Sequence, residues 1–226
     1  MKNLLQGVFM AVLAVGCSYC NADIVSFDFG PTLAAATTTA TTTDPNVTST
    51  AITNGGTGNF TTTLPDYGQP VLQVNPPNND TNDAAEAIAN NSFFSFTVTP
   101  DSGFLLDLTR LDLSAARGGA STARGFEVRS SLDGFSTSLG GDPTIDTVRT
   151  TLTDYSIDLT APAFDAVAGP IEFRVYTFSP VAGNSVEYDD ISLLGEVASV
   201  PEPSSGIFAL AALGCLLRRR KTGLSH

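Results

Sequence analysis

The chain has 226 residues, with 23 acidic and 11 basic side chains, and its formal net charge is −12. This excess of carboxylates repels phosphate backbones and anionic lipid head groups, so the composition disfavours nucleic-acid binding and adsorption to membrane surfaces. All cysteines and the single histidine lie near the two ends of the chain, at Cys17, Cys20, Cys215 and His226.

Residues 1–22 have the three parts of a secretory signal peptide. Lys2 supplies the positive charge, Leu4 to Val15 form the apolar region, and Cys20-Asn21-Ala22 is a small-x-small cleavage site. We expect cleavage after Ala22. The alternative is a lipoprotein signal with a lipidated Cys17, which follows Ala14-Val15-Gly16 but lacks the usual leucine three positions earlier.

Residues 23–198 have the pattern of an all-β domain. Segments rich in alternating apolar residues and bounded by glycine and proline are predicted strands. They lie at 23–29, 93–98, 103–113, 124–131, 152–159, 171–178 and 186–194. The threonine and alanine tract at 32–43 predicts a loop or weak edge strand, and 84–89 predicts one helical turn. Many short strands with little helix predict an antiparallel β-sandwich.

Residues 199–226 combine three features in a fixed order. Pro201-Glu202-Pro203 precedes an uncharged apolar run from Gly206 to Leu217, and Arg218, Arg219, Arg220 and Lys221 follow it. A helix of about twelve residues covers roughly 18 Å, short of the roughly 30 Å hydrocarbon core, so it is a marginal transmembrane helix. The basic cluster would stay on the cytoplasmic side. The alternative is an ordinary C-terminal membrane anchor that is never cut.

This order resembles the PEP-CTERM sorting signal of Gram-negative bacteria. The resemblance implies recognition by an exosortase in the inner membrane, cleavage near Pro201-Glu202-Pro203, and transfer of the body to the cell surface or extracellular matrix. Removal of both ends would take away five of the 11 basic residues. Six arginines would then face 23 acidic residues, which gives the mature body a net charge of −17 if Glu202 stays with it.

The body carries a second resemblance, through the segments 126–135, 173–176 and 187–191. Their strand pattern resembles the jelly-roll body of many PEP-CTERM proteins, which is also similar to carbohydrate-binding and lectin-like modules. The resemblance implies a jelly-roll-like sandwich and assigns no binding residue.

The predicted mature body has no histidine, cysteine or lysine. This excludes Ser-His-Asp and Cys-His nucleophile pairs, zinc sites of the usual type, and phosphate-binding loops that need a lysine. Paired carboxylates could support glycoside hydrolysis, but sequence proximity identifies no pair among 23 acids. We therefore expect no catalytic residues.

Calcium is the cation that the composition favours, because carboxylate oxygens are plentiful. Asp189 and Asp190 are the candidate ligands, and strand-end hydrogen bonding is their alternative role. Because adjacent residues of a regular strand point to opposite faces, we expect at most one of them to serve a given site. The body also has four tyrosines that could stack on sugars or pack in the core, namely Tyr67, Tyr155, Tyr176 and Tyr188.

Together these features predict an exported, non-catalytic cell-surface or extracellular-matrix protein. It would be held transiently in the inner membrane by its C-terminal helix and would associate with extracellular polysaccharide. The alternative is a carbohydrate-binding, lectin-like module with a defined glycan site.

Overall fold

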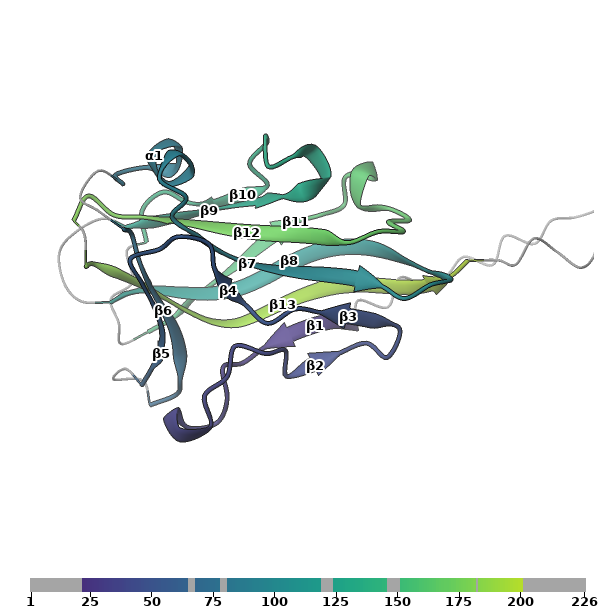
Figure 1. The fold of residues 1–226 in the computed structure, drawn as a ribbon, viewed down its shortest axis with the longest axis horizontal. Helices are drawn as coiled ribbons and strands as arrows, with labels where there is room; N and C mark the ends of the chain where they lie inside the picture. The colour runs from purple at the N-terminus through teal and green to yellow at the C-terminus, as the bar shows by residue number, and fades with distance from the viewer. Residues whose placement is uncertain are drawn as a thin grey trace, which may run out of the picture.

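The computed structural model describes residues 22–64, 68–77, 81–118, 124–145, 151–181 and 183–200. This part of the chain forms two antiparallel β-sheets that pack face to face (Figure 1). The predicted antiparallel β-sandwich is therefore confirmed. Within the same residues, no helix is long and apolar enough to cross a membrane. Residues 1–21 of the predicted signal peptide and the sorting motif from residue 201 onward lie outside the described residues.

Sheet A has seven strands in the order β11-β8-β13-β1-β2, with β6 beside β13 and β5 beside β6. Its centre is β13, which pairs with β8 along one side and with β1 and β6 along the other. The strands are β1 (Ala22–Phe27), β2 (Thr42–Thr43), β5 (Asn59–Thr63), β6 (Val71–Asn75), β8 (Phe104–Gly118), β11 (Thr153–Asp158) and β13 (Ser185–Ser199).

Sheet B has six strands in the order β10-β9-β12-β7-β3, with β4 beside β7. They are β3 (Val47–Ser49), β4 (Thr53–Asn54), β7 (Phe93–Pro100), β9 (Gly125–Ser130), β10 (Gly140–Asp142) and β12 (Ile171–Phe178). The helical elements are η1 (Leu33–Ala35), α1 (Ala84–Ala89), η2 (Ser131–Asp133) and η3 (Pro162–Phe164).

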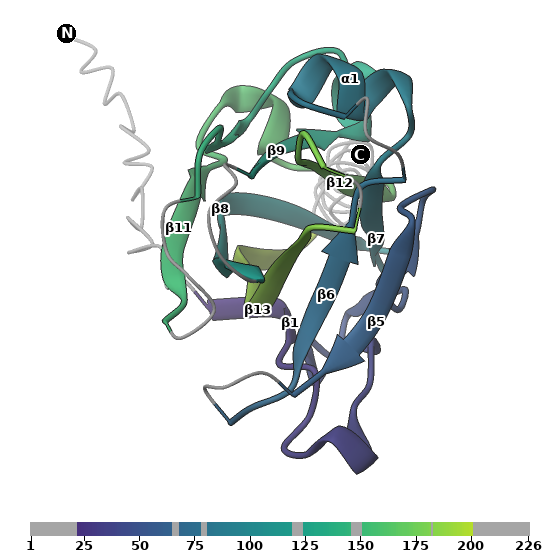
Figure 2. The same cartoon turned by 90° about the vertical axis from the view of Figure 1, so that its left-hand side faces the viewer.

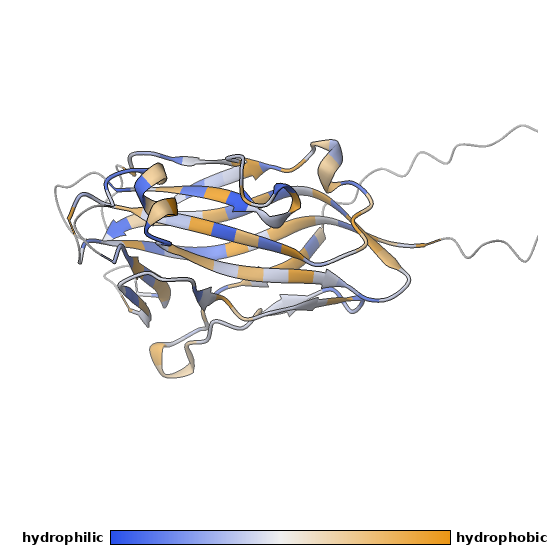
Figure 3. Cartoon of the chain, turned by 45° about the horizontal axis from the view of Figure 1, so that its top comes forward, coloured by the Kyte–Doolittle hydropathy of each residue, from blue (hydrophilic) through white to orange (hydrophobic). Residues whose placement is uncertain are grey.

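The core lies between the sheets, where apolar residues alternate with polar ones along the facing strands (Figure 3). Phe173 of β12 is fully buried and stacks on Phe96 of β7, with ring centroids 5.5 Å apart. Phe94 of the same strand meets Tyr188 of sheet A edge to face at 5.0 Å. Aromatic rings thus join the two sheets, and their burial supplies much of the driving force for folding.

The helix α1 confirms the predicted turn at 84–89 and packs on part of the outer face of sheet B, beside β12 and β9 (Figure 2). The Asp83 side chain caps it by accepting a 3.0 Å hydrogen bond from the Glu86 amide. Ala87 is buried against Tyr176 and Phe178 in a second, smaller apolar cluster.

One difference from the sequence prediction concerns sheet A. The hairpin of β5 and β6 was not predicted, because β6 is buried at four of its five residues and its letters show no alternation. The tract at 32–43 contains only η1 and the two-residue β2, as predicted.

Candidate functional site

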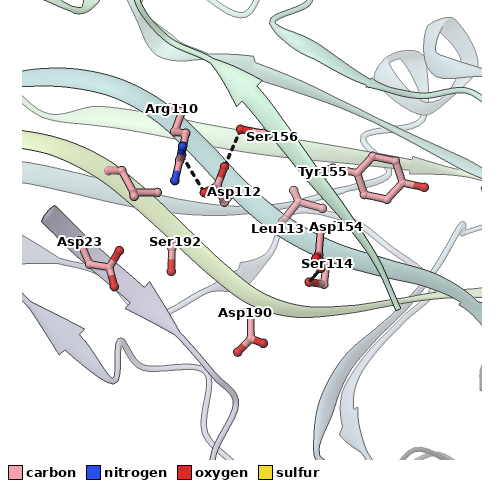
Figure 4. Close-up of a pocket in the computed structure, with 11 residues that line it drawn as sticks. Asp23, Arg110, Asp112, Leu113, Ser114, Asp154, Tyr155, Ser156, Asp190 and Ser192 are labelled. Carbon is pink, nitrogen blue, oxygen red and sulfur yellow. Dashed lines mark hydrogen bonds and ion pairs between the residues drawn. The ribbon is translucent and has the colours of Figure 1, made fainter. Parts of the chain in front are cut away.

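A groove of about 530 Å³ lies on the outer face of sheet A and crosses four neighbouring strands, β1, β13, β8 and β11 (Figure 4). Polar residues line it because they alternate with the core residues of these strands. We call it the sheet A groove. Its lining residues are Asp23, Arg110, Asp112, Leu113, Ser114, Asp154, Tyr155, Ser156, Asp190, Ser192 and Leu194.

Pairs of side chains on β8 and β11 hold the floor of the groove. Ser156 lies opposite Asp112 in the sheet and donates a 2.7 Å hydrogen bond to its Oδ1, while Arg110 Nε donates to Oδ2 at 2.8 Å. Ser114 donates in the same way to Asp154 Oδ1 at 2.7 Å. These bonds orient the carboxylates of Asp112 and Asp154, which both line the groove.

A β-bulge in β13 changes the direction of the next two acidic residues. Asp189 pairs with Ser114 and Ser192 pairs with Asp112, so β13 has one residue more than β8 in this interval. The core residues on either side are Tyr188 and Ile191, three positions apart instead of two.

Asp189 and Asp190 consequently both lie on the outer side of sheet A. The expectation that adjacent residues point to opposite faces was wrong here, because Asp190 takes the left-handed conformation, with φ +46°, and absorbs the extra residue. Asp190 lines the sheet A groove. Asp189 is buried beside it and accepts a hydrogen bond from Gln69 Nε2.

Burial and like charges disfavour ionisation at the bulge. Burial, with the neighbouring carboxylates of Asp190 and Asp28, raises the pKa of Asp189 to about 6. Burial also raises the pKa of Asp190, with further contributions from Asp28 and Asp154. Four aspartates line the groove, and Arg110, the cation that lines it, is paired with Asp112.

The described tyrosines pack in the protein interior more than they face the groove. Tyr188 is fully buried and shares a 2.8 Å hydrogen bond with Thr177, and Tyr176 packs on Phe93 at 5.2 Å. Tyr155 is half-buried, and its hydroxyl donates to Asp142 Oδ2 at 2.8 Å. These contacts favour the packing role, while Tyr67 lies outside the described residues.

The sorting residues Pro201, Glu202, Pro203, Arg218, Arg219 and Arg220 also lie outside the described residues. Ala22, after which we expect signal cleavage, is the first residue of β1 and lies opposite Gly195. The sorting signal and its cleavage remain predictions.

No protein-family model matches the chain, and no curated protein matches it. Among solved structures it is similar to TmCBM27, a carbohydrate-binding module with specific mannan recognition, at 12% identity and a TM-score of 0.39, over 80% of this chain and 99% of that one. It is similar to TmCBM61, solved with β-1,4-galactotriose, at 11% identity and a TM-score of 0.36, over 75% and 99% of the two chains.

A Stig cyclase from Fischerella sp. TAU matches nearly as well. The identity is 12% and the TM-score 0.35, over 84% of this chain and 93% of the cyclase. Because these TM-scores are all below 0.5 and the matches include both binding modules and a cyclase, they carry no argument about function.

Proposed function

We propose that this chain is an exported, non-catalytic surface protein whose β-sandwich binds an extracellular polysaccharide in the sheet A groove. Its C-terminal tail is cut by an exosortase after transient anchoring in the inner membrane. The body has a jelly-roll-like architecture and reaches the cell surface or extracellular matrix.

The observation that carries the glycan-binding part is the lining of the sheet A groove. Carboxylate and hydroxyl oxygens from four adjacent strands line it, and these groups can form hydrogen bonds with the hydroxyl groups of a sugar chain. The groove crosses the strands, so several sugar units could bind side by side. None of the described residues is a histidine, cysteine or lysine, which supports a binding role over nucleophilic catalysis.

A glycan array with two matched variants tests this part. Ser192→Phe places a large side chain in the groove, and Thr99→Phe places the same side chain at a half-buried position on β7 of sheet B. We expect reproducible binding of one glycan class by the parent, a loss of at least about tenfold in Ser192→Phe, and near-parental binding in Thr99→Phe. Absence of glycan binding by the parent, or equal losses in both variants, would contradict the proposal. Release of reducing ends from the bound glycan would contradict its non-catalytic part.

Mass spectrometry of fractionated cells tests the sorting part. With the exosortase present, we expect a mature protein that begins at Asp23 and ends near Pro201-Glu202-Pro203. Without the enzyme, we expect the full tail in the membrane fraction. A full tail in cells that contain the exosortase would overturn the sorting proposal, and a lipidated N-terminal Cys17 would overturn the predicted cleavage after Ala22.

A further inference from the structure

Four carboxylates interact around the β13 bulge, and none of their hydrogen-bond donors in the described part of the chain is a cation. Asp189 interacts electrostatically with Asp190 and Asp28, and Asp190 with Asp28 and Asp154. The donors to this group are neutral: Thr41 Oγ1 and the Gly30 amide bond to Asp28 at 2.6 and 2.9 Å, and Ser114 bonds to Asp154. Among the described residues, no cationic hydrogen-bond donor therefore offsets the repulsion among these side chains.

The second observation is an unsatisfied oxygen at the buried member of this group. Asp189 is 1% exposed, and its Oδ2 accepts the hydrogen bond from Gln69. Its Oδ1 is buried and has no hydrogen-bond partner in the described part of the chain. Buried carboxylate oxygens are costly to leave unpaired and are normally bonded to a donor or a metal ion. The carboxyl group that carries this oxygen also interacts with the carboxylates of Asp190 and Asp28, so a cation is the ligand that would both satisfy the oxygen and offset the repulsion.

The bulge itself is the third observation. It turns two consecutive carboxylates to the same side of the sheet at the expense of a left-handed backbone at Asp190. Only oxygen atoms are offered, which are the ligands that Ca²⁺ prefers. Ca²⁺ also tolerates irregular geometry, whereas Mg²⁺ needs a near-ideal octahedron and dehydrates reluctantly.

We propose that Asp189 and Asp190 bind a Ca²⁺ ion at the β13 bulge, within the negative field of Asp28 and Asp154. In the described residues, no group of three or more acidic, histidine or cysteine side chains is placed to hold a metal ion. Among the described residues, the two bulge carboxylates would thus be the side chains that bind the ion directly, and main-chain carbonyls and water would complete its shell. Such a site belongs to the weak class of extracellular calcium modules, with a Kd on the order of 10⁻⁴–10⁻³ M.

Thermal unfolding and Tb³⁺ luminescence of the purified chain test this site. We expect the Tm to rise in about 5 mM CaCl₂ relative to chelator. MgCl₂ at the same concentration and NaCl at the same ionic strength should raise it much less. Tb³⁺, a luminescent substitute for Ca²⁺, should bind and be displaced by Ca²⁺, and Asp189→Asn and Asp190→Asn should each weaken Tb³⁺ binding by at least about tenfold. Asp165→Asn, at an exposed aspartate elsewhere, is the matched charge control and should bind Tb³⁺ as the parent does.

The Tm and Tb³⁺ measurements test the calcium site independently of glycan binding. Equal Tm shifts with Ca²⁺ and Mg²⁺, or Tb³⁺ binding that survives both bulge substitutions, would overturn the calcium site and leave the glycan proposal intact. Asparagine has the same shape as aspartate and keeps an oxygen that can accept the hydrogen bond from Gln69, so Asp189→Asn should remain folded in chelator. Its Tm there is predicted to exceed the parental value, because the substitution removes the repulsion without an ion.

Discussion

At the residue scale, one arginine is enclosed by aromatic rings on the outer face of sheet B. The guanidinium carbon of Arg174 lies 3.7 Å from the centroid of Phe135 and 4.4 Å from that of Phe93, and Nε donates to Glu172 at 2.8 Å. Phe135 reaches this position through a backbone with φ +61°. The planar guanidinium can stack on both rings while it binds the carboxylate, which the ammonium of a lysine cannot do.

We therefore predict that Arg174→Lys lowers the free energy of unfolding by about 0.5–1 kcal/mol, measured by urea titration. Arg110→Lys is the control, because Arg110 makes an ion pair with Asp112 at a position where its side chain is 45% exposed, and it should change stability by less than about 0.5 kcal/mol. Equal losses in the two variants would show that the rings contribute nothing beyond the ion pair.

Asp133, in the turn after β9, makes a contribution to the stability of the protein that depends on pH. Hydrogen bonds from Thr137 and Ser136 to its carboxylate lower the pKa of Asp133 below the ordinary value. The unfolded chain therefore takes up this proton at a higher pH than the folded protein. The stabilisation by Asp133 is fully present above the pKa that this group has in the unfolded chain. It is lost as the pH falls through the pKa of the group in the folded protein.

Asp133→Ala should accordingly lower the Tm at about pH 7, and the difference from the parent should shrink toward zero near about pH 2. Asp165→Ala removes the same charge from an exposed site outside this turn and serves as the control. A difference between parent and Asp133→Ala that is constant across this range would contradict the assignment.

At the scale of elements, the bulge in β13 shows what the sequence could and could not predict. The strand itself was predicted, because Val186, Tyr188, Ile191 and Leu193 are apolar positions of a β pattern. Tyr188 and Ile191 are three positions apart, whereas core residues of a regular strand are two apart, and this spacing was the sequence signal for an extra residue. The prediction assumed regular alternation and therefore did not include the bulge. Consequently Asp189 and Asp190 were named as candidate ligands, but their common face was not.

The backbone of the bulge provides a prediction that separates conformation from charge. Asp190 has φ +46°, a conformation that asparagine and glycine adopt readily and β-branched residues do not. In chelator, Asp190→Val should be about 1–2 kcal/mol less stable than Asp190→Asn, although both remove one charge. Asp190→Gly should match or exceed Asp190→Asn. Equal stability of the Val and Asn variants in chemical denaturation would mean that the bulge is not maintained in solution.

At the scale of the whole molecule, the layer architecture was predictable and the groove was not. Alternation within each strand reports which residues face a core, so two apolar faces and an antiparallel sandwich follow from local pattern. The sheet A groove depends on the order of the strands, because Asp23, Asp112, Asp154 and Asp190 come from four segments far apart in the sequence. Local periodicity contains no information on that order.

The charge of the mature body is the remaining property of the whole molecule that affects its stability. If both ends are removed as proposed and Glu202 stays with the body, six arginines against 23 acidic residues leave a net charge of −17, and folding brings these charges closer together. Raising NaCl from about 0.01 M to about 0.1 M shortens the Debye length from about 30 Å to about 10 Å, which weakens the repulsion across the domain. In chelator, we expect this change to raise the stability by on the order of 1 kcal/mol, or the Tm by about 2–4 °C.

The double variant Asp23→Asn, Asp165→Asn should show a smaller salt-dependent rise in Tm, because it carries two fewer negative charges. If the Tm stayed constant or fell with salt, the local ion pairs would outweigh the net repulsion, and the acidic surface would not be a destabilising feature of the fold.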